Sequence, residues 1–222
     1  MSASGQDAVD PDLEAFVGLV RAGCADLPRP LRGLEMFARD GSWFTRHLAG
    51  LVDEMECWEI NSAYLPDLKR NIPGALVRQV DSIAEAGRTN HRFGLVSLDN
   101  PQGVYGDYCE HFEALARAAR IVADQAVLVF NINVRPYRAK VSAAKDDYGM
   151  TTLDTWFERR AAFYGRPAEA LDLDFVADFY RGRLEGWGLI MRAFRGVLFP
   201  SAVAGHPDYL YRVAVSVERE AP

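Results

Sequence analysis

The sequence lacks several features that mark membrane, secreted and nucleotide-hydrolysing proteins. No apolar run reaches the ~18–20 residues of a transmembrane helix, so we expect no membrane partner. The N-terminal stretch MSASGQDAVDPD has neither the basic nor the apolar region of a signal peptide. The three cysteines, Cys24, Cys57 and Cys109, form no CxxC pair, which favours a reduced, cytoplasmic setting. The sequence contains no serine-hydrolase elbow, no P-loop and no set of metal ligands at structural spacing, so no metal is expected.

The sequence does contain enough apolar residues for one globular domain. Of the 222 residues, 49% are hydrophobic, and the formal net charge is −6. An acidic chain has no general field that attracts nucleic acid, so such binding needs a local basic patch. We expect a disordered tail over residues 1–10 and a single domain over residues 11–222. The sequence does not indicate an oligomeric state.

Hydrophobic periodicity predicts alternating strands and helices up to about residue 134. Asp10 can cap a helix that runs from Pro11 to about Ala22. Five strands are expected after it, at residues 32–38, 55–60, 75–80, 92–99 and 126–134. The helices between them are expected at residues 42–52, 62–72 and 108–122. This alternation predicts an α/β fold, with a mostly parallel sheet and helices on both faces.

The last part of the chain has a different order of elements. A helix over residues 173–184 is followed by two strand-like runs, residues 188–200 and 209–220. Only a loop of Pro, Gly and His residues joins these runs. Two strands joined without a helix are typical of an antiparallel hairpin. The sequence therefore predicts five strands of the βα type and a terminal antiparallel pair.

Polar groups follow several of the predicted strands. In an open parallel sheet, ligands bind beyond the carboxyl ends of the strands. Gly41 follows the first strand and can supply a positive-φ turn. Glu59 ends the second strand, where an acid can bind ribose hydroxyls, although a solvated surface acid gives the same pattern. Asp81 and Ser82 follow the third strand, and residues 99–101 follow the fourth. Together they predict a ligand site at this edge.

These segments resemble the motifs of the class I S-adenosylmethionine-dependent methyltransferases. LEMFARDGSWFTRHL is similar to their first motif, an acid-bearing strand that runs into a glycine loop. ECWEIN is similar to the second-strand acid motif, VDSI to the segment that contacts adenine, and SLDNPQG to the DPPY motif. The terminal hairpin resembles the sixth and seventh strands of the family. The resemblance extends from about Leu31 to Arg219 and implies a Rossmann-like, doubly wound sheet of seven strands.

The resemblance also implies roles for individual residues and a cofactor, S-adenosylmethionine. Glu35 matches the acid that faces the methionine amine, and Glu59 matches the ribose acid, with Ile60 beside it. The other implied cofactor contacts are the loop residues Phe37, Ala38 and Gly41, and Asp81 and Ser82 near the adenine. The acceptor is expected to be held by Asp99, Asn100 and the carbonyl of Pro101.

The chain departs from the family pattern at two places. Arg39 replaces a glycine whose missing Cβ lets the backbone approach the cofactor. A long side chain there would either block the pocket or turn outward and cover it. Asn100 and Gln102 replace the first proline and the aromatic residue of DPPY. Because that aromatic residue stacks on a target base in the family, methylation of a base does not follow from the resemblance.

The stretch from Arg135 to about Arg166 is too long for a simple loop. It is locally basic, and its second half, TTLDTWFERRAAFYG, has the apolar spacing of a helix. Because it follows the fifth strand, it is expected over the edge that carries the site. A substrate lid, a structural excursion packed on the sheet and a partner-binding surface all fit this insertion.

The leading hypothesis is methyl transfer from S-adenosylmethionine to a nitrogen or oxygen acceptor, either a small molecule or a nucleic acid. In such a reaction the protein mainly aligns the acceptor with the methyl group and stabilises the lost proton. The alternative is a methyltransferase-like protein that has lost catalysis and serves as a binding or scaffold protein. Arg39 and the altered DNPQ segment favour this alternative, and a fold alone does not decide between the two.

Overall fold

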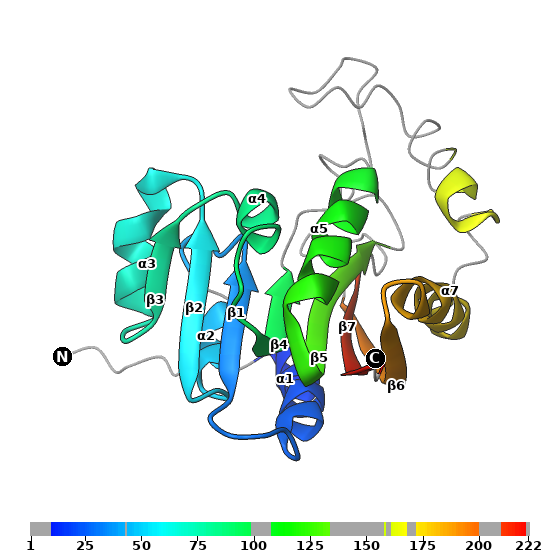
Figure 1. The fold of residues 1–222 in the computed structure, drawn as a ribbon, viewed down its shortest axis with the longest axis horizontal. Helices are drawn as coiled ribbons and strands as arrows, with labels where there is room; N and C mark the ends of the chain where they lie inside the picture. The colour runs from blue at the N-terminus through cyan, green and yellow to red at the C-terminus, as the bar shows by residue number, and fades with distance from the viewer. Residues whose placement is uncertain are drawn as a thin grey trace.

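The computed structural model describes residues 10–42, 44–98, 108–133, 158, 161–167, 172–199 and 210–220. These residues form one seven-stranded sheet with the strand order β3-β2-β1-β4-β5-β7-β6. Strands β1 to β5 run parallel to one another, whereas β7 runs antiparallel to both β5 and β6. Figure 1 shows the strands in this order, with the carboxyl ends of β1 and β2 at the top. The predicted fold class is therefore confirmed.

The strands lie close to the predicted positions. Their bounds are β1 Arg32–Met36, β2 Glu54–Glu59, β3 Leu76–Gln79, β4 Phe93–Leu98, β5 Val122–Asn133, β6 Leu189–Phe199 and β7 Leu210–Arg219. Strand β5 begins four residues earlier than its apolar run suggested. Its residues from Ala126 to Ile132 are all buried, as expected for a strand covered on both faces.

The helices cover both faces of the sheet. Their bounds are α1 Pro11–Cys24, α2 Thr45–Ala49, η1 Ser62–Tyr64, α3 Leu65–Asn71, α4 Ser82–Ala86, α5 Tyr108–Ile121 and α7 Leu173–Glu185. Asp10 caps α1 as predicted, because its side chain accepts a hydrogen bond from the backbone N–H of Asp12. The five-residue helix α4 was not predicted, and α2 is shorter than the pattern suggested.

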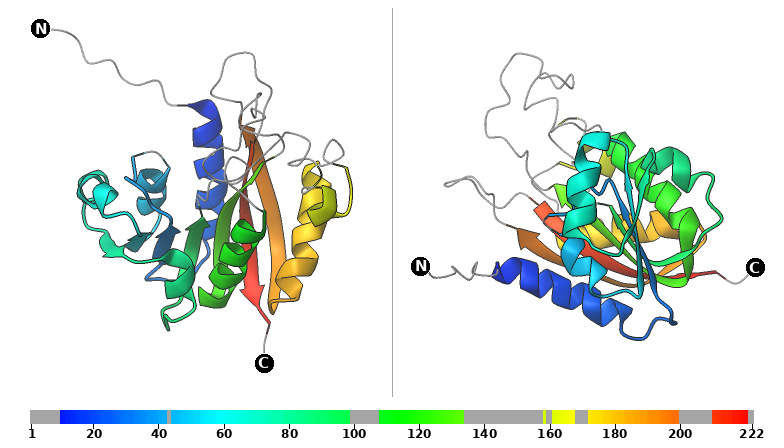
Figure 2. Two further views of the ribbon diagram at one scale, coloured as in Figure 1. Left: turned by 90° about the horizontal axis from the view of Figure 1, so that it is seen from above. Right: turned by 90° about the vertical axis from the view of Figure 1, so that its left-hand side faces the viewer.

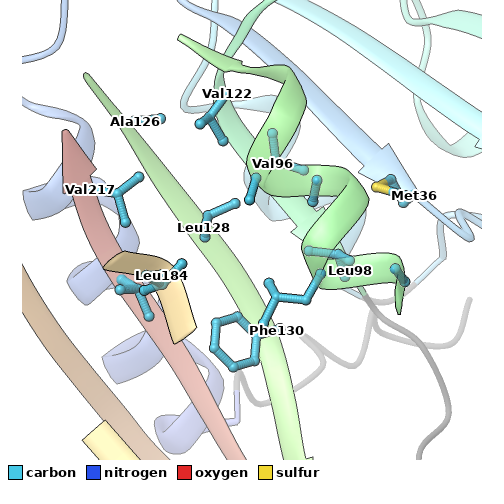
Figure 3. Close-up of a cluster of buried hydrophobic side chains, with 14 of the residues drawn as sticks. Met36, Val96, Leu98, Val122, Ala126, Leu128, Phe130, Leu184 and Val217 are labelled. Atoms are coloured by element: carbon cyan, nitrogen blue, oxygen red, sulfur yellow. The ribbon is translucent and has the colours of Figure 1, made fainter. Parts of the chain in front are cut away.

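Two apolar layers fix the helices against the sheet (Figures 1 and 2). On one face, side chains of β4 and β5 such as Val96, Leu128 and Phe130 pack against α5 and α7, as Figure 3 shows. On the other face, Phe16 of α1 and Leu48 of α2 pack against β4, β5 and β7. Burial of this kind contributes roughly 25 cal/mol per Å² of apolar surface, so both layers stabilise the sheet.

The predicted insertion and tail fall mostly outside the described residues. Residues 1–9, 134–157 and 200–209 are not described, so the lid, excursion and partner interpretations of the insertion stay open. Residues 161–164, from its second half, are helical, and Tyr164 there is buried against the α7 side of the core. No helix among the described residues has the length and apolar character needed to cross a membrane.

Candidate functional site

The loop after β1 adopts the backbone conformation of a glycine-rich loop although it contains a single glycine. Phe37 and Arg39 have positive φ angles of 62° and 47°, and Gly41 has a φ of 65°. Positive φ is uncommon for residues other than glycine and costs roughly 1–2 kcal/mol per residue. Such strain persists only where the surrounding structure holds it, and it concentrates at functional sites.

Glu59 is the group that holds the middle of this loop. Its Oε2 accepts a hydrogen bond from the backbone N–H of Arg39 at 2.7 Å, and its Oε1 accepts one from Asn61 at 2.7 Å. The side chain is the last of β2 and is only 5% exposed. Glu59 is therefore not the solvated acid that the sequence left open. It ties the β1 loop to the end of β2 through charge-assisted hydrogen bonds, which are among the stronger ones in proteins.

Two further side chains fix the ends of the loop. The hydroxyl of Ser82, at the start of α4, accepts the backbone N–H of Phe37 at 3.2 Å. The amide of Asn71, at the end of α3, donates to the carbonyl of Asp40 at 2.8 Å. Ser82 is buried. Side chains from β2, α3 and α4 therefore hold the loop. These contacts offset the backbone strain at Phe37 and Arg39, the two loop residues other than glycine that have a positive φ.

Arg39 does not block the loop from within. Its guanidinium carbon lies 5.4 Å from the centre of the Tyr64 ring, which belongs to the short helix η1 beyond β2. Arg39 is exposed, and within the described part of the chain it forms no ion pair with Glu35. The left-handed backbone of Arg39 explains this arrangement. It points the side chain in a different direction from the one that a right-handed backbone would give. Of the two expected arrangements, the structure has the outward one.

Gly41 occupies a place where no side chain fits. A Cβ there would lie 2.7 Å from Cδ1 of Leu68 and 2.9 Å from Cγ1 of Ile72. Both of these α3-side residues are buried. The glycine is needed for its positive φ and also for the close approach of α3.

Glu35 is buried within the sheet just below the loop. It is 0% exposed, and its Oε1 accepts a hydrogen bond from the hydroxyl of Ser97 on β4 at 3.0 Å. Register places Glu35 between Cys57 of β2 and Ser97. The sequence analysis identified Glu35 but not Ser97. The only feature of the sequence that pointed to Ser97 was its position two residues before the end of the predicted fourth strand.

Ile60 directly follows Glu59 in the sequence, and Asp81 directly precedes Ser82. Ile60 is 63% exposed, one of two large apolar side chains so exposed among the described residues. Asp81 caps α4, because its Oδ1 accepts the backbone N–H of Ala84 at 2.9 Å. Helix α4 is further held by Arg78 of β3, which bridges the carboxylates of Glu56 and Glu85 at 3.1 and 2.6 Å.

The predicted site residues therefore fall into two groups. The cofactor set is brought together at the carboxyl ends of β1 and β2 and the start of α4; it comprises Glu35, Phe37, Ala38, Gly41, Glu59, Ile60, Asp81 and Ser82. The predicted acceptor residues Asp99, Asn100 and Pro101 lie outside the described residues, so their role stays a prediction.

Sequence reasoning missed two buried polar side chains at the same edge. Asn131 of β5 is 6% exposed, and Arg212 of β7, which is opposite it, is 2% exposed. The guanidinium carbon of Arg212 lies 4.8 Å from the ring centre of Phe44 and 5.3 Å from that of Phe199. Strand periodicity puts Arg212 on the same face of β7 as Ala214. A charged residue in a strand ordinarily indicates a face that is exposed to solvent, so the sequence did not predict that Arg212 is buried.

A cleft of about 750 Å³ lies at the opposite, amino-terminal edge of the parallel strands. Pro30, Arg92 and Arg32 are among its lining residues. Arg32 pairs with Glu54 at 3.2 Å, and Arg219 donates to backbone carbonyls at the end of α5. These pairs belong to the framework of the sheet. Ligands of open parallel sheets bind at the carboxyl edge, so this cleft is not the candidate site.

The fold is that of the class I S-adenosylmethionine-dependent methyltransferases. The N-methyltransferase NodS of Bradyrhizobium japonicum, solved with S-adenosyl-L-homocysteine, matches with a TM-score of 0.57 and 13% identity over 97% of this chain and 90% of that one. An rRNA methylase of Streptococcus thermophilus matches with a TM-score of 0.51 and 12% identity, over 96% and 99% of the two chains. A ribosomal protein L11 methylase of Lactobacillus delbrueckii subsp. bulgaricus matches with a TM-score of 0.51 and 8% identity, over 96% of this chain and 81% of that one.

No family model and no curated protein sequence matches the chain. The three solved structures are named for different acceptors, and their identities to this chain are low. They support the fold predicted from the motifs, whereas the chemistry has to be argued from the residues of the site.

Proposed function

We propose that this protein binds S-adenosylmethionine at the β1 loop and transfers its methyl group to a nitrogen or oxygen acceptor. The main support is the grip of Glu59 on the loop. The left-handed backbone at Phe37 and Arg39 puts strain on the loop. The buried carboxylate of Glu59 stabilises this conformation by accepting the backbone N–H of Arg39. Strain of this kind is concentrated at functional sites.

The residues present fit this cofactor. The carboxylate of Glu59 has lone pairs beyond the two that accept backbone N–H groups, and these can accept ribose hydroxyls. The exposed Ile60 offers an apolar surface for the adenine, and the buried Glu35 supplies a negative charge for the methionine amine. The cofactor supplies an electrophilic methyl group on a sulfonium. When bound, the cofactor would supply this methyl group to the acceptor, whose proton would be lost.

The acceptor side of the proposal concerns Asp99, Asn100 and Pro101, which follow β4. An acid, an amide and a backbone carbonyl can orient an amine or hydroxyl and receive its proton. The expected cytoplasmic setting belongs to the same proposal, and the free thiols of Cys24 and Cys57 fit a reduced compartment.

Calorimetry with S-adenosylhomocysteine tests the proposal. Glu59→Ala should weaken binding about 30- to 150-fold, or roughly 2–3 kcal/mol, because it removes the acceptor for both the ribose and the loop. Glu54→Ala is the matched control, since Glu54 lies exposed at the other end of β2, and it should leave affinity unchanged. A wild-type protein without measurable affinity would rule the proposal out.

A second measurement distinguishes the proposed enzyme from the alternative, an inactive binding or scaffold protein. A protein that binds S-adenosylhomocysteine and transfers no methyl group to any member of a broad panel of amine, hydroxyl and RNA acceptors would fit that alternative. Methyl transfer that is lost in Glu59→Ala and kept in Glu54→Ala would fit the enzyme.

A further inference from the structure

Helix α4 is too short to hold its own position, yet it carries the serine that fixes one end of the β1 loop. It consists of five residues, Ser82–Ala86, and an isolated helix of that length is unstable in water. Its first residue, Ser82, accepts the backbone N–H of Phe37 at 3.2 Å. Figure 1 shows α4 beside the carboxyl ends of β1 and β2. The geometry of the loop therefore depends on what holds α4.

One side chain ties the far end of α4 to the sheet. Arg78 of β3 donates from one guanidinium nitrogen to Oε1 of Glu85, the fourth residue of α4, at 2.6 Å. Its other terminal nitrogen donates to Oε1 of Glu56 on β2 at 3.1 Å. A planar guanidinium presents several N–H groups in fixed directions, so it can bind two carboxylates at once. Arg78 thus connects α4 to the second strand of the sheet.

Glu56 gives this connection a rigid base. The residue is 3% exposed, and the indole N–H of the fully buried Trp58 donates to its Oε1 at 2.7 Å. A buried carboxylate is unfavourable unless it is paired. Arg78 is the nearest of its cations, since Arg32 and His91 lie 3.8 and 3.7 Å from its Oε2. The core therefore holds one end of the Arg78 guanidinium, and the other end holds α4.

We propose that Arg78 is a positioning residue of the cofactor site. By joining β2 to α4 it keeps Ser82 in contact with the β1 loop, and it thereby sets the affinity for the cofactor. This inference rests on the proposed function above. A further contact at the same corner supports it, because the backbone N–H of Val80 donates to the carbonyl of Glu59 at 3.2 Å. The segment between Arg78 and α4 thus runs beside the acid that holds the loop.

A purely stabilising Arg78 predicts a different outcome. Loss of its side chain would then lower the free energy of unfolding, while the folded protein would bind the cofactor as before. The amides of the loop would exchange faster by one common factor, because their exchange would follow global unfolding. If Arg78 positions α4, the contact supplied by α4 loosens more than its neighbours do.

Arg32→Met is the matched control for Arg78→Met. The side chains of Arg32 and Arg78 are 34% and 31% exposed, and each lies over an aromatic ring. Both pair with Glu56, but Arg32 otherwise pairs with Glu54 and forms no ion pair with α4 in the described part of the chain. Glu85→Ala is the second test variant. It removes only the bond to α4 and leaves the buried pair intact, so it also serves if Arg78→Met does not fold.

Two neighbouring amides of the loop report the contact without a ligand. The N–H of Phe37 donates to the hydroxyl of Ser82, which α4 supplies. The N–H of Ala38 donates at 2.9 Å to the carbonyl of Trp58, which β2 supplies. Because the two donors are adjacent in the chain, global unfolding exposes both, whereas movement of α4 exposes only the first.

Hydrogen exchange followed by NMR measures this difference. In Arg78→Met and Glu85→Ala, exchange of the Phe37 amide should accelerate at least threefold more than exchange of the Ala38 amide, relative to wild type. In Arg32→Met the two amides should accelerate by the same factor. Equal acceleration of the two amides in Arg78→Met and Glu85→Ala would overturn the inference.

Calorimetry with S-adenosylhomocysteine gives the second readout. Arg78→Met and Glu85→Ala should each weaken binding about threefold to tenfold, as expected for loss of one hydrogen bond that shapes the loop. Arg32→Met should stay within about twofold. The double variant of Arg78→Met and Ser82→Ala should bind within about twofold of Arg78→Met alone, since both changes act on one contact.

Unchanged affinity in Arg78→Met, or fully additive losses in the double variant, would also overturn the inference. A wild-type protein that does not bind S-adenosylhomocysteine would instead count against the proposed function. The exchange rates of the two amides would then still decide whether Arg78 positions α4 on the loop.

Discussion

The two sides of the sheet use polar side chains in different ways. Around the β1 loop, Glu59, Ser82 and Asn71 bind backbone N–H and C=O groups. On the β4, β5 and β7 side, polar groups contact other side chains: Ser97 donates to the Glu35 carboxylate, and Arg212 lies on two phenylalanine rings. The first arrangement shapes the main chain, and the second orients functional groups.

The difference shows which substitutions each side tolerates. Where side chains hold the backbone, the identity of the loop residues matters less than their φ angles, and so Phe37 and Arg39 can adopt positive φ angles that ordinarily favour glycine. Where side chains hold one another, each chemical group is itself part of the site. Loss of a glycine from a motif is therefore a weaker sign of lost function than loss of a group that supports the loop.

The largest expected effect is on the loop side, from Gly41→Ala. The added Cβ meets Leu68 and Ile72 and also forces an alanine to a φ of 65°, so unfolding free energy should fall by about 2–4 kcal/mol. Gly74→Ala is the control, because Gly74 has a φ of 89° and open space around it. It should lose only about 1 kcal/mol. Equal losses in urea unfolding would show that close packing of α3 on the loop is unimportant.

On the other side, Ser97→Ala should lower stability by about 1.5–3 kcal/mol, since it removes a hydrogen bond to a buried carboxylate. A double-mutant cycle with Glu35→Gln measures the coupling between the two groups. A coupling energy near zero would contradict the view that these side chains depend on one another.

Ser82→Ala should have a smaller effect, about 1 kcal/mol, because a single neutral hydrogen bond to the N–H of Phe37 is lost. The loop should loosen, and S-adenosylhomocysteine affinity should fall severalfold. Ser62→Ala, at the exposed start of η1, should leave affinity unchanged in the same calorimetric titration. If both variants bind like wild type, Ser82 does not help to shape the loop.

The smallest effect is expected from Arg39→Gly. Relief of strain and the greater chain entropy of glycine nearly offset each other, so stability should change by less than about 1 kcal/mol. Because the guanidinium lies on Tyr64, affinity for S-adenosylhomocysteine should stay within about threefold. Arg39→Ala separates the effect of losing the charge from the effect of relieving the strain. It removes the guanidinium but keeps a Cβ on a residue with positive φ. A tenfold gain in affinity, about 1.4 kcal/mol, would mean that Arg39 occludes the pocket in solution.

Most of the sheet was predictable because its strands have clear periodicity and turn residues. The capped helix α1, the doubly buried β5 and the terminal antiparallel pair all follow from local patterns. The five-residue helix α4 was missed, because one turn held by Asp81 and by the Arg78 bridge has no periodic signal. Its existence depends on contacts with β2 and β3 that only the fold creates.

The site was predictable in part. The positions of Glu59 and Gly41 at strand ends were evident from spacing, whereas Glu35, inside β1, was identified by the resemblance to the methyltransferase motif. The orientation of Arg39 was not, because it depends on a left-handed backbone that Glu59 stabilises from another strand. Asn131 and Arg212 were missed for a different reason: periodicity assigns a face to a residue, but it does not tell which charged residue a fold will bury.

The position of β7 has a consequence for how the protein is made on the ribosome. Strand β7 follows β6 in the chain, yet it lies between β5 and β6 and is the strand on which β6 pairs in the described part of the sheet. During synthesis, β6 therefore emerges before its partner and waits with an unpaired edge, which is a hazard for aggregation. Arg212 arrives with β7, so the packing of Phe44 and Phe199 around its guanidinium is completed only in the final stage of folding.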